Sequence, residues 1–452
     1  MIYPTEGQVS NLPLLNDCPA HIYSWVQYAP ADKIKGIQTE LFLSHLSYTL
    51  QRSLFYRESF KKNGIDLNDI RKLTDLTELP LTDKTDLENT ESFCCADPQT
   101  IVDICLTSGT SKSQATIIPL TAPDLSRLAY NEEIALGMAG ISSSDILLVC
   151  AALDRCFMAG MAYFLGGTRL SATVVRAGAG SAAQQWGLVC RTHATAIVGV
   201  PSLLYKIGKY ALEQEEDPAA SSIQKLIAIG EPTRDKFLSL LPISQELETM
   251  WDAPIFSTYA SSEMATTFCE CKARAGGHVR PELIIMEILD DNGRHLPDGK
   301  QGEVVVTPLG VTGMPLIRFK TGDISHILTA PCSCGRTTPR IAPVTGRKNQ
   351  MLKYKGTTLF PNTILSALEG YNQFHGGYVE ARQYPDGTDR VILYAALNGE
   401  VATPENISWI KDRLRATVRV VPEIKCISRE EADKKVYQLR KNRKRINFFD
   451  LR

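Results

Sequence analysis

The feature that most constrains this chain is an alternation, from about residue 100, of short apolar runs with segments of helical length. The runs are TIVDICLT, DILLVCAAL, ATVVRA, ATAIVGVP, KLIAIGE and PIFSTYA. Parallel strands need a long crossover between them, which is usually a helix, so this alternation is typical of a parallel sheet. The pattern predicts an α/β fold with a doubly wound sheet.

The regions on either side of this alternation differ from it. Residues 1 to about 95 contain amphipathic helical stretches such as IQTELFLSHLSYTLQRSLFYRESFKK. Around residues 283 to 330 the apolar runs come closer together, with the turn sequences DDNG and LPDGKQG between them, which indicates a small antiparallel β subdomain. We therefore expect a large N-terminal domain at 1–345 and a small, mobile α+β domain at 346–452.

The composition limits the kinds of partner that this chain can bind. The 49 Lys and Arg residues nearly balance the 50 Asp and Glu residues, so the chain has no net field to attract nucleic acid or an anionic membrane. The N-terminus lacks the basic and apolar segments of a signal peptide. The most apolar stretch is interrupted by Asp154 and Arg155, which are costly in lipid. We expect a cytoplasmic protein that binds neither nucleic acid nor membrane.

Two close cysteine pairs, Cys269/Cys271 and Cys332/Cys334, are the first candidates for metal ligands, because cytoplasmic thiols stay reduced. The segment FCECKARAGGH adds His278. Thiolate and imidazole are the ligands that Zn²⁺ prefers, and a closed Cys₃His set is typical of a structural site. Four thiols in the core or in loops, without a metal, are the alternative.

A hydroxyl-rich loop interrupts the segment DICLTSGTSKSQATIIPLT at 103–121. Its side chains and backbone N–H groups suit phosphate oxygens, and its glycine permits close approach of the backbone. By itself a polar hairpin turn accounts for the run equally well. The candidate phosphate ligands are Thr107, Ser108, Gly109, Thr110 and Ser111.

Four further motifs follow in a fixed order: IAIGEPTRD with Gly230, Glu231 and Pro232; YASSE at 259–263; GEVVVTPLGVTGMPLIRFKTGD at 302–323; and TPRIAPVTGRKNQMLKYKGTTLFP at 338–361. With the hydroxyl-rich loop, they resemble the motifs of the adenylate-forming enzymes, the superfamily of acyl-CoA synthetases. Within it the chain most resembles the phenylacetate-CoA ligase branch, whose C-x-C-G-R-T-x-P-R run stands at 332–340. The resemblance covers the chain from about residue 20 to the end.

The resemblance implies that a carboxylic acid, which we expect to be aromatic, is activated with ATP as acyl-AMP and transferred to CoA. It places Tyr259 against adenine and Ser262 at the α-phosphate, and it gives Glu263 to Mg²⁺, which prefers hard oxygen ligands. Asp323 is expected to hold the ribose hydroxyls, and Arg318 matches a family arginine. Taken singly, Tyr259 is as readily explained as a core residue and Asp323 as a turn residue.

Further family residues lie toward the C-terminus. Arg347 matches an arginine at the junction of the two domains that also reaches the nucleotide. The loop after it resembles the one that enters the site for thioester formation. The tail KNRKRINFFDLR places the adenylation lysine at Lys444, with Lys441 as the neighbouring register and a solvated basic tail as the alternative. The family pattern selects Cys271, His278, Cys332 and Cys334 as zinc ligands and leaves Cys269 spare.

The acyl pocket and two departures from the family pattern leave alternatives open. Phe157, Met158 and Tyr163 are expected to line the pocket for the acid or to be core residues. The phosphate loop has Lys112 and Gln114 where the family has glycine and proline, and the hinge has Asn349 and Gln350 in place of aspartates. Transfer to an amine or a carrier protein, or nucleotide binding with weak turnover, therefore remain alternatives. The sequence leaves a homodimer open.

Overall fold

The computed structural model describes residues 24–107, 115–154, 156–354, 357–369, 371, 373–384, 389–397, 403–418, 420–437 and 447–452. Within these ranges the chain forms two compact units. The first comprises the described parts of Met1–Thr233, Leu247–Thr321 and His326–Pro343, and the second those of Arg234–Glu246, Gly322–Ser325 and Val344–Arg452. The expected domain limits of 1–345 and 346–452 stay a prediction.

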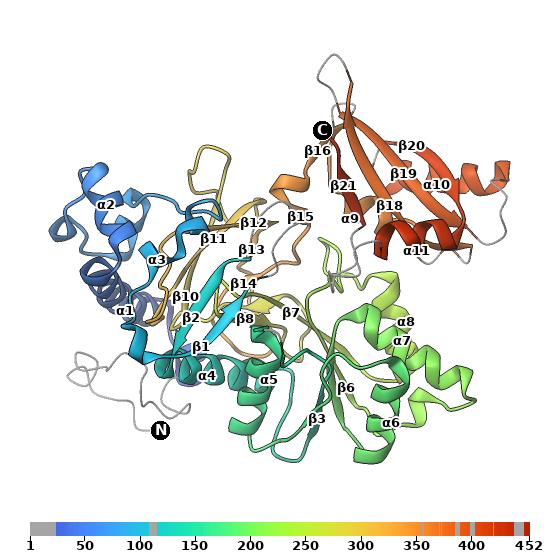
Figure 1. Cartoon of the computed structure of the whole chain (residues 1–452), viewed down its shortest axis with the longest axis horizontal. Helices are drawn as coiled ribbons and strands as arrows, with labels where there is room; N and C mark the ends of the chain where they lie inside the picture. Colours follow the sequence, from blue (N-terminus) through green and yellow to red (C-terminus); the bar gives the residue numbers. More distant parts are fainter. Residues whose placement is uncertain are drawn as a thin grey trace. The chain divides into compact units, whose positions relative to one another are not determined.

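A six-stranded sheet in the order β4-β3-β5-β6-β7-β8 forms the centre of the first unit (Figure 1). Neighbouring strands from β4 to β7 are parallel, and β8 is antiparallel to β7. Because β4 lies on one side of β3 and β5 on the other, the predicted doubly wound sheet is confirmed. The strands are β3 (Ile146–Val149), β4 (Thr173–Arg176), β5 (Ala196–Gly199), β6 (Lys225–Ala228), β7 (Ile255–Ser261) and β8 (Thr266–Cys269).

Helices connect these strands, as the alternation in the sequence predicts. Helix α4 precedes β3, and the four crossovers that follow contain α5 to α8 in chain order. Strands β5 and β6 are almost entirely buried apolar residues, as expected where both faces of a parallel sheet are covered. The helices are α4 (Ala122–Met138), α5 (Met158–Arg169), α6 (Ala182–Thr192), α7 (Pro201–Glu213) and α8 (Pro242–Trp251).

The expected antiparallel β region is present. Strands β10 (Ile284–Leu289) and β11 (Gly302–Pro308) pair in antiparallel register. A small sheet in the order β13-β14-β9 joins β9 (Gly277–His278) to β14 (Arg340–Ile341) and β14 to β13 (Ile327–Leu328). This pairing brings His278 beside residues that lie about sixty positions later in the chain.

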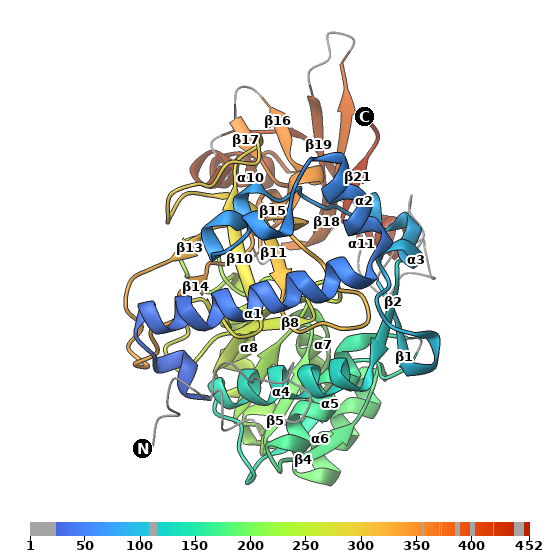
Figure 2. The same ribbon diagram turned by 90° about the vertical axis from the view of Figure 1, so that its left-hand side faces the viewer.

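The N-terminal region is helical from Ser24 onward. Its α-helices are α1 (Ala31–Arg52), α2 (Leu54–Lys62) and α3 (Thr90–Phe93), and its 3-10 helices are η3 (Ser24–Tyr28), η4 (Leu67–Asp69), η5 (Leu73–Glu78), η6 (Asp86–Asn89) and η7 (Pro98–Thr100). Ser53 separates the first two helices, and its side chain accepts a hydrogen bond from Tyr56 N at the start of α2. Helix α1 runs across the β10 region in Figure 2, and Gln38 Nε2 donates to the Ile284 carbonyl over 3.1 Å.

These helices share one hydrophobic core with the β strands around them. Buried Phe42, Leu46 and Phe93 belong to the same cluster as Ile284 and Val304. The cluster also includes residues of the antiparallel hairpin of β1 (Ile101–Leu106) and β2 (Ile117–Thr121). The N-terminal region is therefore an integral layer of the first unit. Among the described residues, no helix has the length and apolar character needed to cross a membrane.

The second unit has its own core and the expected α+β composition. A four-stranded sheet has the order β20-β19-β18-β21, and β16 (Leu352–Tyr354) pairs with β17 (Thr357–Leu359). Residues such as Val379, Leu393 and Ile410 form a separate hydrophobic cluster. The remaining elements of this unit are β18 (Phe374–Gln383), β19 (Asp389–Leu397), β20 (Glu423–Ile427), β21 (Phe448–Asp450), α9 (Pro361–Ser366), α10 (Pro404–Val418), α11 (Arg429–Tyr437) and the short helix η9 (Lys348–Gln350). The short helix η8 (Pro218–Ala220) belongs to the first unit.

Helix α4 carries a carboxyl group into the core of the first unit. Glu132 is 2% exposed. Its Oε1 accepts hydrogen bonds from Asn131 Nδ2 and Thr267 Oγ1, while Oε2 has no partner among the described residues. Burial raises the pKa of Glu132 from 4.5 to about 7, against the opposing effect of these hydrogen bonds. The folded protein therefore keeps this group protonated at a pH where the unfolded chain has lost the proton.

This difference predicts a pH-dependent stability. Below about pH 4.5 both states are protonated, so the ionisation of Glu132 does not change the stability. As the pH rises to about 7 the unfolded state alone ionises, and folding loses up to about 3 kcal/mol. Glu132→Gln should remove this loss, so its stability relative to wild type should rise between pH 4.5 and pH 8 in urea denaturation. The exposed Glu40→Gln is the control. A constant difference across this pH range would contradict the prediction.

Candidate active site

Two predicted motifs follow neighbouring parallel strands. Gly230, Glu231 and Pro232 come after β6, while Ser262 and Glu263 come after β7. The carboxyl ends of parallel strands meet at one edge of the sheet, which is where ligands bind in open α/β sheets. Glu231 already has a structural task at this edge, because its carboxylate accepts hydrogen bonds from the N–H and hydroxyl of Ser202 at the start of α7, over 2.9 and 2.7 Å.

The residues on either side of the predicted phosphate loop are hydrogen-bonded to each other. Thr107 N donates to the Thr116 carbonyl, and Thr116 N donates to Thr107 Oγ1, both over 3.0 Å. These two bonds close the hairpin of β1 and β2 below the loop. Ser108, Gly109, Thr110 and Ser111 lie outside the described residues, as does the predicted lysine Lys444. Their roles stay predictions.

Glu263, the predicted magnesium ligand, has a cationic neighbour that the sequence did not reveal. Its buried carboxylate lies 3.2 Å from Nζ of half-exposed Lys84. A single lysine in the connector LTDKTDL carries no signal for this contact, because the two residues are far apart in the chain. The contact shows that the position beside Glu263 accommodates positive charge. A hard carboxylate oxygen at such a position fits Mg²⁺, which takes its other ligands from phosphate and water.

Asp323 and Arg347 are cross-strand neighbours in the second unit. They pair in register between β12 (Phe319–Ser325) and β15 (Gly346–Arg347). Arg347 Nε lies 3.1 Å from Asp323 Oδ1. The predicted ribose ligand and the predicted junction arginine thus lie together, although their roles toward a nucleotide stay predictions.

Arg318 has a structural role that the sequence did not indicate. Its side chain is 4% exposed and forms a two-pronged ion pair with Glu287, Nε to Oε2 over 3.1 Å and Nη2 to Oε1 over 2.9 Å. Nη1 donates to the carbonyls of Thr77 and Leu79. The guanidinium therefore ties β10 to the N-terminal layer. Its nucleotide role stays a prediction.

The aromatic residues of the prediction take different positions. Tyr259 is half-buried, and its ring stacks on Phe268 of the neighbouring strand with centroids 5.8 Å apart. Tyr163 lies in the core of the central sheet, with its hydroxyl 3.5 Å from Thr258 Oγ1, as the core alternative expected. Met158 lines a pocket, which Phe157 does not.

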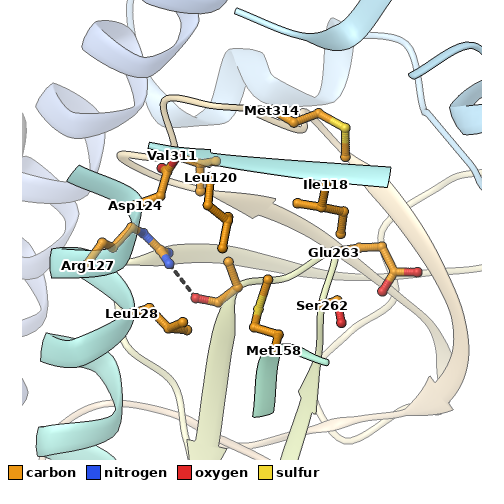
Figure 3. Close-up of a pocket in the computed structure, with 11 residues that line it drawn as sticks. Ile118, Leu120, Asp124, Arg127, Leu128, Met158, Ser262, Glu263, Val311 and Met314 are labelled. Atoms are coloured by element: carbon orange, nitrogen blue, oxygen red, sulfur yellow. Dashed lines mark hydrogen bonds between the residues drawn. The ribbon is translucent and has the colours of Figure 1, made fainter. Parts of the chain in front are cut away.

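This pocket lies within the first unit and is a small cavity of about 20 Å³ that opens to solvent (Figure 3). Ser262 and Glu263 are at one side of it, and Asp124 and Arg127 are at the other. Apolar side chains form most of the wall. The lining residues are Ile118, Leu120, Asp124, Arg127, Leu128, Met158, Ser262, Glu263, Ala265, Val311 and Met314.

The predicted zinc ligands come together. One ligand atom from each of Cys271, His278, Cys332 and Cys334 lies within 4.8 Å of the others. The Cys271 and Cys332 Sγ atoms are 3.6 Å apart, and Cys334 Sγ is 3.4 Å from His278 Nε2. A zinc tetrahedron with Zn–S bonds of about 2.3 Å has sulfurs about 3.8 Å apart, so the set fits zinc.

The surroundings of the cluster suit metal ligands. His278 Nδ1 lies 3.1 Å from Thr338 Oγ1, which orients the ring so that Nε2 is left for the thiols. Burial, and then nearby arginines, lower the pKa of His278 to about 3, so the imidazole is neutral as a ligand must be. Cys269 Sγ donates to the Glu270 carbonyl, and its place outside the ligand set stays a prediction.

Comparison with known proteins agrees with this architecture. A sequence model of the family described as "AMP-binding enzyme" matches residues 52–314. Phenylacetate-coenzyme A ligase of Thermus thermophilus is 27% identical over 346 residues, which are 75% of this chain and 76% of that protein. The Escherichia coli (strain K12) protein of the same name is 26% identical over 350 residues, 75% of this chain and 77% of its own.

A solved structure resembles nearly the whole chain. It is 2-hydroxyisobutyryl-CoA ligase in the postadenylation state, in complex with 2-HIB-AMP. The TM-score is 0.82 at 21% identity, and the match covers 95% of this chain and 92% of the other. At this identity the likeness concerns the fold.

The contacts of Arg318 predict a loss of stability when they are removed. Arg318→Met should lower the free energy of unfolding by about 3 kcal/mol, because Glu287 would lose its buried partner. Urea denaturation of the full chain measures this. The control Arg294→Met removes an exposed partner of Asp290 and should cost less than about 1 kcal/mol. Wild-type stability with weakened ATP binding in Arg318→Met would instead favour the nucleotide role.

Proposed function

This chain belongs to the AMP-binding enzyme family, and we propose that it activates a carboxylic acid with ATP as acyl-AMP and transfers the acyl group to CoA. The observation that carries the proposal is the match of the AMP-binding enzyme family over residues 52–314, a range that includes Ser262 and Glu263 after β7. The carboxylate of the acid would lie beside these two residues, which are assigned to the α-phosphate and to Mg²⁺.

In the first half-reaction a carboxylate oxygen attacks the α-phosphorus of ATP, and pyrophosphate leaves. The protein's task is to offset negative charge on the phosphates and to hold the reactants in line. Ser262 would donate its hydroxyl hydrogen to an α-phosphate oxygen, and Lys444 would place its ammonium between the acid and the phosphate. Glu263 would hold Mg²⁺, which neutralises phosphate charge when bound. Asp323 would accept hydrogen bonds from the ribose hydroxyls.

The second half-reaction forms a thioester with release of AMP, and it separates the main proposal from its alternatives. The relatives named as CoA ligases support CoA as the acceptor. Asn349 and Gln350, in the short helix after Arg347, are the departures that keep an amine or a carrier protein as the alternative acceptor. A cytoplasmic location stays a prediction from the sequence.

Acid-dependent exchange of labelled pyrophosphate into ATP tests the first half-reaction, and CoA-dependent release of AMP tests the second. Glu263→Gln and Lys444→Ala should each lower exchange at least about a hundredfold, since the first weakens the hold on Mg²⁺ and the second removes an ammonium that offsets charge at the α-phosphate. The exposed Glu213→Gln is the matched control and should exchange at the wild-type rate. If exchange occurs but CoA does not affect the release of AMP, the adenylation half of the proposal stands. The acceptor is then an amine or a carrier protein.

We also propose that Cys271, His278, Cys332 and Cys334 hold a structural zinc ion. The fit of their spacing to a tetrahedron supports this proposal. The ion would link β9 to the loop before β14, in addition to the two residue pairs between these strands. With four protein ligands the ion would have no position left for water, so it would stabilise the fold and take no part in the reaction.

Metal analysis tests the zinc proposal. Protein purified without added metal should contain about one zinc per chain, and a strong chelator should lower its melting temperature. Cys271→Ser should lose the metal and melt lower, while Cys190→Ser, at an exposed free cysteine, should keep both properties. Metal-free protein whose melting temperature is the same with and without chelator would refute the proposal.

A further inference from the structure

We propose that Arg127 is a positioning residue for the turn that carries Ser262 and Glu263. The inference deepens the proposed function, on which its kinetic consequence rests, because these two residues are assigned to the α-phosphate and to Mg²⁺. Arg127 lies on α4, 138 positions before Ala265 at the end of this turn.

Both assigned residues stand on a tight turn between β7 and β8. Ser261 and Thr266 form the residue pair at the end of the two strands, which leaves the residues 262–265 between them. Ala265 N donates to the Ser261 carbonyl over 3.2 Å, and Met264 N donates to Ser261 Oγ over 3.3 Å. These bonds close the base of the turn.

The end of the turn has an unfavourable backbone conformation. Ala265 lies in the left-handed region, with a φ of 46°. Residues with a side chain adopt this conformation only where contacts from the surrounding structure hold them in it. Arg127 supplies such a contact, because its Nη1 donates to the Ala265 carbonyl (Figure 3). Its Nη2 donates to Thr266 Oγ1 over 3.0 Å, so one guanidinium binds the last residue of the turn and the first residue of β8.

The guanidinium is itself held by the core of the first unit. Nε donates to the Leu309 carbonyl over 2.7 Å, and Nη2 also donates to the Leu283 carbonyl over 2.6 Å. Arg127 is only 1% exposed. A movement of the turn that breaks its bonds to this group would leave an N–H donor buried without that acceptor, which is unfavourable. The bonds to the core therefore also restrain the turn.

The following turn of α4 holds the strand behind this contact. Asn131 lies four residues after Arg127 and thus on the same face of the helix, and its Oδ1 accepts from Thr267 N over 3.1 Å. Glu132 Oε1 accepts from Thr267 Oγ1. Helix α4 thereby binds three successive residues, and Arg127 makes the contact with the turn itself.

NMR of methyl-labelled methionine measures the turn directly. Met264 lies in the turn and is fully buried, so its methyl signal depends on how the turn packs. Met264→Leu identifies this signal among the nine methionines of the chain. Arg127→Leu should shift or split the signal, because the end of the turn loses its bond to α4.

A matched control separates this effect from a general loss of stability. Asp145→Asn changes a buried carboxylate that accepts from Thr195 Oγ1 over 2.8 Å and from Lys225 Nζ over 2.7 Å. These residues lie at the amino ends of β3, β5 and β6, at the opposite edge of the sheet from the turn. The variant should be less stable in urea and should keep the wild-type Met264 signal.

Pyrophosphate exchange measures the kinetic consequence. Arg127→Leu should lower kcat at least about tenfold, because a displacement of catalytic groups by about 1 Å can cost about a hundredfold. The KM for the acid should stay within about twofold of wild type, since the turn is assigned to phosphate and metal. Thr266→Val removes one of the two bonds and should lower kcat by a smaller factor. Asp145→Asn should exchange at the wild-type rate.

The outcomes separate this inference from the proposed function. Either an unchanged Met264 signal in Arg127→Leu, or a kcat within about twofold of wild type, would overturn the positioning role. An equal loss of kcat in Asp145→Asn would also overturn it, because the loss would then follow from stability. If the wild type shows no exchange with any acid, the proposed function falls, and the Met264 signal alone decides the inference.

Discussion

The carboxylate of Asp124 is the interaction on which the first unit depends most. It caps α4 through Thr121 and, at the same time, receives the backbone of Thr312 and Gly313 from a segment nearly two hundred residues away. One turn later on α4, Arg127 binds the carbonyls of Leu309 and Leu283. A single helix start thus joins the β hairpin, the β10–β11 region and the wall of the pocket, and apart from the cap with Thr121 these contacts are remote in sequence.

This arrangement places charged groups in the core in two different ways. Arg318 meets the carboxylate of Glu287, whereas Arg127 is satisfied by backbone carbonyls and a threonine hydroxyl. Carbonyl dipoles return only part of the hydration energy that a buried cation loses, which agrees with the lowering of the Arg127 pKa to about 10 by burial. Such a residue adds little net stability but favours one packing of α4 over others, because another packing would leave its N–H donors without partners.

The sequence predicted those parts of the molecule whose signal is local or that follow a family pattern. Alternating apolar runs predicted the parallel sheet, since the hydrophobic pattern of each strand and each crossover helix lies within its own segment of the sequence. The cysteine and histidine cluster was predicted from ligand chemistry and the family pattern, and the pairing of β9 with β14 brings its members together. Lys84, Arg318 and the pocket wall were not predicted in their observed contacts, because the partner of each lies far away in the chain. A lysine or an arginine in the sequence does not indicate which carboxylate it contacts in the folded protein.

Two sides of the pocket are held in place by different parts of the fold. Ser262 and Glu263 follow β7, so the strands of the central sheet fix their positions. Val311 and Met314 lie on a segment whose backbone is bound by Asp124, Tyr48 and Cys95. Because those bonds hold the main chain, the two side chains can differ in size without moving the backbone between them. The shape of the pocket can therefore change through substitutions at Val311 and Met314 while Ser262 and Glu263 remain where the sheet holds them.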